Sequence, residues 1–177
     1  MGRLIGVTLL SALLLLGCSD QEPLTDNLEI GKPMPEVKLQ RLDGGKPDAL
    51  SDYRGKLVVL NLWATWCEPC RREMPNLQKL SQTLDKDHFA VIGMSQDKED
   101  YLAREYLIDK KVDFAEYIDP GGAITMGKLG ISLFPYTLLI APDGRLIQRI
   151  TGPRQWQRQE VVDLLERVYK GDYSGLR

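Results

Sequence analysis

The chain has 177 residues, a net charge of −2, three cysteines and one histidine. This length predicts a single domain with its own core once an amino-terminal targeting segment is removed. The small net charge and the lack of a dense Lys/Arg cluster argue against nucleic-acid binding. The one histidine, His88, falls in a predicted loop where we expect it to be solvated, and we expect no bound metal.

The first 17 residues are expected to be a signal peptide. A positive amino-terminal region precedes residues 4–16, which carry no charge and are too few to span a bilayer. This apolar run ends in Leu15-Leu16-Gly17-Cys18, which resembles the bacterial lipobox, whose cysteine is acylated after cleavage. The alternative is a plain signal peptide with an incidental cysteine. We expect a lipid on Cys18 and a polar tether at residues 18–30.

The first half of the domain alternates strand and helix. Residues 37–39 alternate as a strand, and 43–45 form a turn. Residues 57–63 are too continuously apolar for a surface strand, which predicts a place in the middle of a sheet. A helix follows, and residues 89–94 are a second buried strand. The apolar positions of that helix recur every three or four residues: Met74, Leu77, Leu80 and Leu84.

The second half continues the alternation. A helix is expected at 97–110, a short strand at 114–118 and a short helix through 126–129 after the break at Asp119-Pro120-Gly121-Gly122. Strands at 136–140 and 145–150 flank a strong hairpin signal at 142–144.

A final amphipathic helix opens at 151–153 and ends at Gly171. We place Trp156 on its apolar face as a core residue, and do not assign Arg154, Trp156 and Arg158 to a site. The order of elements predicts one α/β domain at residues 31–172 with a mixed sheet.

The strongest functional signal is Cys67-Glu68-Pro69-Cys70, directly after the central strand. An ordinary thiol has a pKa of about 8.5, and the first turn of a helix favours the reactive thiolate. Pro69 suits that turn because it has no N–H to lose. We therefore assign Cys67 as nucleophile and Cys70 as resolving thiol, with half of a zinc site as the alternative. A lone pair is more typical of catalysis than of structural disulfides, which usually come in several.

Two glutamates near the cysteines differ in their expected roles. Glu68 stabilises the helix start but opposes a thiolate beside it, so the Glu68-Pro69 dipeptide is expected to tune the redox potential. Glu73, if it turns toward the cysteines, can take up and return the proton of Cys70. The alternative for Glu73 is a solvated side chain next to Arg71 and Arg72.

The segment from Asn61 to Pro75 closely resembles the membrane-anchored thioredoxin-like proteins of the bacterial envelope, the TlpA/ResA/CcmG group with the AhpC/TSA-like variant of the fold. The resemblance covers roughly residues 30–170 and includes Gly31–Pro35, Leu50–Lys56 and Leu129–Ile140. It implies a thioredoxin fold with a mixed central sheet, an N-terminal β extension and a central helix–strand insertion at 97–130.

The resemblance also implies roles for single residues. Pro135 matches the cis-proline that faces the disulfide, which places Phe134 and Pro135 at the substrate-binding surface. Trp66 matches the tryptophan that covers the nucleophile, and Glu73 matches an active-site glutamate. Ordinary thioredoxins carry an aspartate where this chain has Asn61, which leaves Glu73 to handle protons.

The predicted function is that of a lipid-anchored thiol–disulfide oxidoreductase facing the periplasm, on the outer or inner membrane. By resemblance it reduces substrate disulfides and receives electrons from a DsbD/CcdA-type membrane protein. Expected substrates are apocytochrome c, copper-site assembly proteins or oxidised exported proteins. We expect a monomer with no cofactor besides the redox-active Cys67–Cys70 disulfide.

Two other functions compete with this prediction. A peroxiredoxin-type peroxidase would need Thr and Pro where this chain has Ala64 and Leu60. A non-catalytic metallochaperone or apoprotein-binding module on the same fold is the second alternative.

Overall fold

The computed structural model describes residues 27–176. The predicted signal peptide, Cys18 and most of the predicted tether lie outside these residues. The described end of the tether packs on the domain, because the Asn27 N–H donates to the Leu129 carbonyl and Leu28 is buried. Within residues 27–176, no helix is long and apolar enough to cross a membrane.

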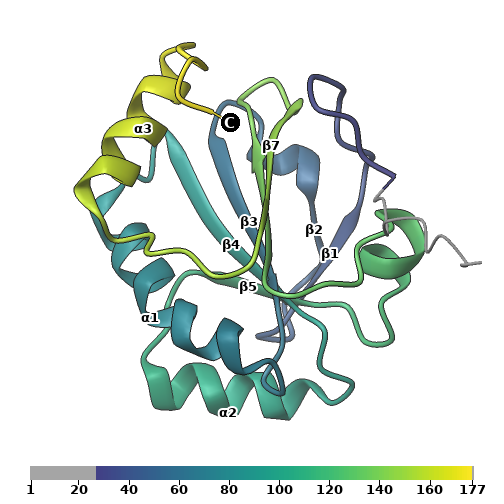
Figure 1. Cartoon of the computed structure of the whole chain (residues 1–177). Coiled ribbons are helices and arrows are strands. Elements are labelled where there is room, and N and C mark those ends of the chain that lie inside the picture. The colour runs from purple at the N-terminus through teal and green to yellow at the C-terminus, as the bar shows by residue number, and fades with distance from the viewer. Residues whose placement is uncertain (1–26, 177) are drawn as a thin grey trace, which may run out of the picture.

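A seven-stranded mixed sheet in the order β2-β1-β5-β4-β3-β6-β7 forms the centre of the molecule (Figure 1). The central strand β3 pairs in parallel with β4 and antiparallel with β6, and β4 pairs in parallel with β5. The other pairs are antiparallel. This arrangement confirms the predicted α/β class with a mixed sheet. The strands are β1 (Lys38–Arg41), β2 (Asp48–Ala49), β3 (Leu57–Trp63), β4 (Phe89–Ser95), β5 (Ala115–Ile118), β6 (Tyr136–Ile140) and β7 (Leu146–Thr151).

The helices lie around this sheet as Figure 1 shows, with α1 and α3 against one face and α2 across the lower end. All seven residues of β3 are buried, as its apolar run predicts. One face packs with side chains of α1 and α3, and the other with the amino-terminal segment and the chain around residues 129–131. The helical segments are η1 (Leu50–Tyr53), α1 (Glu68–Thr83), α2 (Asp100–Lys110), the π-helix η2 (Ala123–Lys128) and α3 (Gln159–Tyr169).

The structure corrects three predicted helices and adds one strand. The helix expected at 97–110 begins only at Asp100, the short helix is a π-helix, and the two-residue strand β2 was not predicted. The final helix begins at Gln159 rather than at 151–153. The predicted start is too early because Thr151 is still the last residue of β7.

Candidate active site

The two cysteines of the motif form a disulfide at the amino-terminal end of α1. Cys67 is the N-cap residue of α1, and its Sγ accepts a 3.3 Å hydrogen bond from the Cys70 N–H. Pro69 lies within the first two helical positions, where the missing N–H costs nothing. Cys67 is 7% exposed and Cys70 is 1% exposed. A partner sulfur can therefore approach Cys67 more readily than Cys70, and the helix end favours a thiolate at Cys67.

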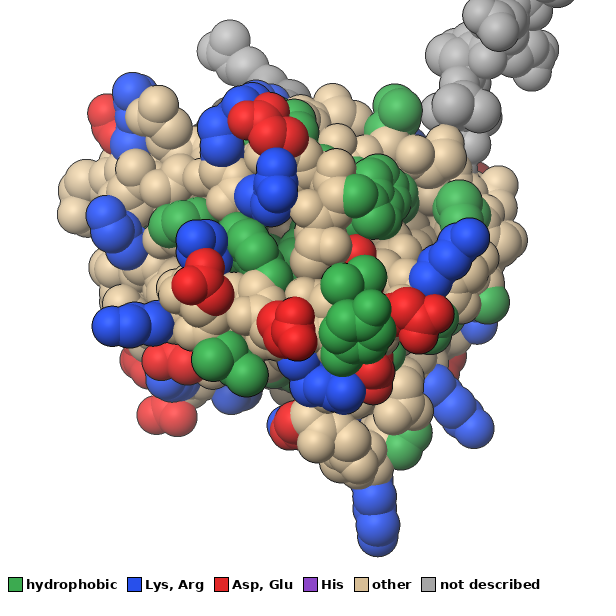
Figure 2. Space-filling view, turned by 90° about the horizontal axis from the view of Figure 1, so that it is seen from below, with side chains coloured by type: hydrophobic (Ala, Val, Ile, Leu, Met, Phe, Trp, Pro, Cys, Tyr) green, Lys and Arg blue, Asp and Glu red, His purple; other side chains and the backbone are tan. Residues whose placement is uncertain are grey.

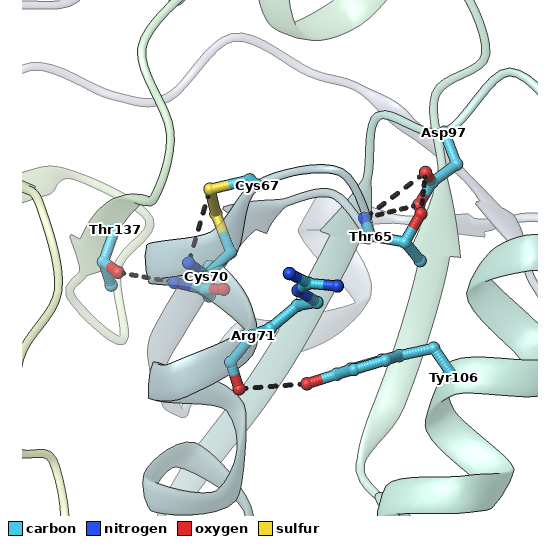
Figure 3. The surroundings of a disulfide bond; sticks show 8 residues. Thr65, Cys67, Cys70, Arg71, Asp97, Tyr106 and Thr137 are labelled. Atoms are coloured by element: carbon cyan, nitrogen blue, oxygen red, sulfur yellow. Dashed lines mark hydrogen bonds between the residues drawn. A yellow bond between two sulfur atoms is a disulfide. The ribbon is translucent and has the colours of Figure 1, made fainter.

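The turn before the cysteines is held by a buried carboxylate, that of Asp97 (Figure 3). Asp97 accepts hydrogen bonds from the Thr65 N–H at 3.0 Å and from the Thr65 hydroxyl at 2.6 Å. It also accepts a 2.6 Å hydrogen bond from the Ser95 hydroxyl at the end of β4. These contacts fix the loop that presents Cys67. No pattern in the sequence indicates this role for Asp97.

Glu73 is buried beneath the first turns of α1, with 1% exposure. Its Oε1 accepts hydrogen bonds from the Arg154 N–H, at 3.1 Å, and from the Trp156 indole N–H. Its Oε2 is buried and has no hydrogen-bond partner. The alternative of a solvated glutamate is therefore wrong. The placement of Trp156 on the last helix is also wrong, because Trp156 precedes α3 and contacts the site.

Burial raises the pKa of Glu73 from its usual 4.5 to about 7. The hydrogen bonds from Trp156 and from the Arg154 N–H act in the opposite direction because they stabilise the carboxylate. Glu73 follows Cys70 by three residues, so both side chains project from neighbouring positions of one helix. A carboxyl group with this pKa can both accept and return a proton near neutral pH.

Asn61 occupies the buried position on β3 where ordinary thioredoxins carry an aspartate. It is 1% exposed, and its amide donates a 3.0 Å hydrogen bond to the Thr137 hydroxyl on β6. The register pairs Asn61 with Thr137 on one side and with Gly93 of β4 on the other. A neutral amide at this position leaves Glu73 as the titratable group on that side of the site.

Of the predicted substrate-binding residues, Trp66 is exposed, Phe134 is half-buried and Pro135 is buried. The Phe134–Pro135 peptide bond is cis, as expected. Trp66 is 65% exposed, and its ring makes an edge contact with Phe134 at a centroid distance of 5.9 Å. The view from below in Figure 2 shows exposed hydrophobic side chains among acidic and basic ones on this end of the molecule.

Glu68, the other residue of the intervening dipeptide, points to solvent. Its side chain is 57% exposed and forms an ion pair with Arg72 one turn along α1. Such an exposed pair contributes little to stability. Glu68 directly follows Cys67 in the sequence, and its role in tuning the redox potential stays a prediction.

A further carboxyl group with a buried oxygen, that of the partly exposed Glu116 on β5, was not predicted. Its Oε2 accepts a 2.9 Å hydrogen bond from the indole N–H of Trp63, and its Oε1 is buried without a partner. Burial raises the pKa of Glu116 from its usual 4.5 to about 8. In sequence it is a single polar residue in a short strand, which is typical of a surface position.

No group of three or more side chains able to hold a metal ion is found among residues 27–176. His88, the one histidine, is half exposed and forms an ion pair with Asp85. The thiol chemistry of the site needs only the two cysteines, the helix end and a proton acceptor.

Comparison with known proteins agrees with this geometry. The family model described as Redoxin matches residues 29–165. The thiol-disulfide oxidoreductase ResA of Bacillus thuringiensis subsp. konkukian is 33% identical over 143 residues, covering 81% of this chain and 80% of the relative. The ResA of Bacillus subtilis is 25% identical over 150 residues, covering 85% and 82%.

Solved structures give the same result for the fold. A Chlorobium tepidum protein assigned as a thiol:disulfide interchange protein DsbE is 25% identical with a TM-score of 0.70, covering 80% of this chain and 98% of that one. A DsbF homologue from Corynebacterium diphtheriae is 28% identical with a TM-score of 0.63, covering 74% and 85%. The fold is thus of the thioredoxin-like type.

Proposed function

The chain belongs to the Redoxin family and is a thiol-disulfide oxidoreductase of the ResA type, and on this premise we propose that it reduces disulfide bonds in exported proteins. The main observation in support of this proposal is the combination of a slightly exposed Cys67 at a helix end with a buried Cys70 and a buried Glu73. In this arrangement only one sulfur meets the substrate, and the second acts from inside.

The proposed reaction has two exchange steps. The Cys67 thiolate attacks one sulfur of the substrate disulfide, forms a mixed disulfide and releases the other substrate sulfur as a thiolate. The Cys70 thiolate then attacks the Cys67 sulfur, and the Cys67–substrate bond breaks. Two electrons pass to the substrate, which gains two thiols, and the Cys67–Cys70 disulfide remains.

Glu73 supplies the proton acceptor for the second step. Cys70 is buried and reacts only after it loses its proton, and the Glu73 carboxylate can take up that proton because its pKa is about 7. When the enzyme is reduced again, Glu73 returns the proton to Cys70. Peroxidase chemistry gains no support from this arrangement of two closely spaced cysteines.

The exposed Trp66 and the half-buried Phe134, beside cis-Pro135, provide the surface for the substrate. By resemblance to the family, the backbone before Pro135 faces the cysteines, where it can pair with an extended substrate segment. The aromatic rings add apolar contact area that suits an unfolded or flexible chain.

The setting of the reaction is part of the proposal. A lipid on Cys18 and a tether at residues 18–30 would hold a monomeric domain at the envelope membrane, facing the periplasm. A DsbD/CcdA-type membrane protein would restore the dithiol. Apocytochrome c or copper-site assembly proteins would be substrates, with no cofactor besides the disulfide.

The test is the equilibrium redox potential of the Cys67–Cys70 pair, titrated in the purified protein against glutathione and dithiothreitol. We expect a value well below about −200 mV, on the thioredoxin side of the known range. A value near −120 mV, typical of a strong oxidant, would overturn the reducing direction. A Cys67→Ser variant that kept full biological activity would favour the binding module instead.

A further inference from the structure

Glu116 has no task in the reaction described above, yet the fold makes room for it. A side-chain carbon on Gly93, its partner on β4, would meet the two Glu116 carboxylate oxygens at 2.3 and 2.4 Å. The carboxylate therefore lies over Gly93, with one oxygen on the Trp63 indole and the other unpaired. A buried polar oxygen without a partner costs free energy of folding and calls for an explanation.

Contacts run from Glu116 to the first turn of α1. The Trp63 indole lies 5.5 Å from the Tyr106 ring, measured between centroids. The Tyr106 hydroxyl donates a 3.0 Å hydrogen bond to the carbonyl of Arg71, the residue after Cys70 (Figure 3). The Arg71 N–H in turn donates to the Cys67 carbonyl at 3.1 Å. The insertion thus holds the peptide between Arg71 and Arg72, one residue beyond Cys70.

Trp63 is also part of the apolar packing around the cysteines. It is fully buried and belongs to the same apolar cluster as Cys67, Cys70 and Met74. The orientation of its indole ring is set by the one hydrogen bond that its N–H makes, which is to Glu116. A rotation of this ring would change the packing beneath both sulfur atoms.

We propose that Glu116 is a positioning residue for the exchange reaction, which fixes Trp63 and, through Tyr106, the Arg71 carbonyl, so that Cys70 lies in line to attack the mixed disulfide on Cys67. In that attack the Cys70–Cys67 bond forms, and the substrate sulfur leaves with the electron pair of the broken bond. The inference rests on the proposed function of Cys70 as resolving thiol.

The neutral form of Glu116 predominates at neutral pH because burial raises its pKa to about 8. A glutamine in its place therefore imitates the form that acts at pH 7, with the same size and an acceptor oxygen for Trp63. The titratable Tyr106 faces Glu116. Charged side chains also face it from a pocket of about 340 Å³ beside it: Arg41, Asp43, Arg104 and Asp113.

The test separates the two exchange steps with the aromatic disulfide 5,5′-dithiobis(2-nitrobenzoate) added to the reduced protein. Release of the first thionitrobenzoate reports the attack by Cys67, and release of the second reports the attack by Cys70. We expect Glu116→Leu to slow the second release at pH 7 by about threefold to tenfold, the equivalent of one hydrogen bond, and to leave the first unchanged. Glu116→Gln should restore both rates.

Gln78, on the helix α1 that carries Cys70, provides a matched control. Its amide donates a 2.7 Å hydrogen bond to the Asp113 carboxylate and accepts one of 3.0 Å from the Asp113 N–H, which links α1 to the insertion far from the cysteines. Gln78→Ala should leave both releases unchanged. If it slows the second release as Glu116→Leu does, the effect is general loosening and the proposal is wrong.

Two further results would overturn the proposal: an unchanged second release in Glu116→Leu, or a slow second release in Glu116→Gln. Should Glu116→Leu not fold, Trp63→Phe keeps a ring, removes the N–H and carries the same expectation. A wild-type protein that releases no second thionitrobenzoate would instead contradict the proposed role of Cys70. The two failures are therefore distinguishable.

Discussion

Two glutamates with buried carboxylate oxygens, Glu73 on α1 and Glu116 on β5, have closely similar surroundings. Each has one carboxylate oxygen on an indole N–H, from Trp156 for Glu73 and from Trp63 for Glu116. Each has its other oxygen buried without a partner. The difference is a second donor, the Arg154 N–H, which only Glu73 receives.

That difference separates their protonation. Burial raises both pKa values, to about 7 for Glu73 and about 8 for Glu116, and hydrogen-bond donors to the carboxylate act against burial. At neutral pH Glu73 is divided between its two forms, as a proton carrier must be, while Glu116 is mostly neutral. Besides its indole partner, Glu73 has the Arg154 N–H, the Arg154 charge and the Asn61 amide to lower its pKa, whereas Glu116 has only its indole partner.

The largest effect is expected when Glu73 can no longer accept a proton. Glu73→Gln removes the proton acceptor for Cys70 and should slow the release of the second thionitrobenzoate at pH 7 by about 100-fold, within the usual contribution of general base catalysis. Glu116→Gln should remain close to wild type in the same assay. Equal slowing in both variants would mean that the two carboxyl groups share one role.

The next effect concerns the space over Gly93. Gly93→Ala places a carbon against the Glu116 carboxylate and should lower the free energy of unfolding by about 1–3 kcal/mol, as overpacking does. Gly127→Ala is the control, because a carbon there meets its nearest neighbour only at 3.8 Å. Urea unfolding of the oxidised protein measures both. A Gly93→Ala variant as stable as wild type would show that the carboxylate can move aside.

The third effect is on stability against pH. Each carboxyl has a folded-state pKa above its usual 4.5, so the stability due to its neutral form is complete below pH 4.5 and is lost as pH rises to about 7 for Glu73 and about 8 for Glu116. Each group can remove at most about 1.4 kcal/mol per pH unit in its window.

Urea unfolding of the oxidised protein at intervals from pH 4 to 9 resolves these windows. Glu73→Gln should flatten the decline that ends near pH 7, and Glu116→Gln the part that continues to pH 8. A Glu116→Gln variant with the wild-type slope between pH 7 and 8 would contradict the assigned pKa of Glu116.

Local signals in the sequence predicted much of the fold. The apolar run 57–63 and the strand 136–140 have the bounds of β3 and β6, because a continuous apolar run and a following turn mark a buried strand without help from other segments. The cysteine spacing placed Cys67 at the start of α1 for the same reason. The end of the last helix at Gly171 also follows from one residue, whose φ is 92°.

Such local signals could not predict the surroundings of the two glutamates. Trp156 meets Glu73 across 83 positions of the chain, and Trp63 meets Glu116 across 53. Spacing within one helix or strand does not specify which strands become neighbours, so it cannot show that Gly93 leaves room for a carboxylate. The start of the last helix was misplaced for a related reason, since Thr151 pairs with Tyr136 of β6 as the last residue of β7.

The smallest effect is expected when the positive charge of Arg154 is removed. Its positive side chain lowers the pKa of Glu73, whereas its N–H, which makes the hydrogen bond, remains in any substitution other than proline. Arg154→Gln should therefore raise the pKa of Glu73 by a fraction of a pH unit, and the pH profile of the second thionitrobenzoate release should move upward by the same amount. The stability window assigned to Glu116 should not move, because Arg154 does not contribute to its pKa. A shift in both would show that the two carboxyl groups, although separate in their contacts, titrate together through the interior of the domain.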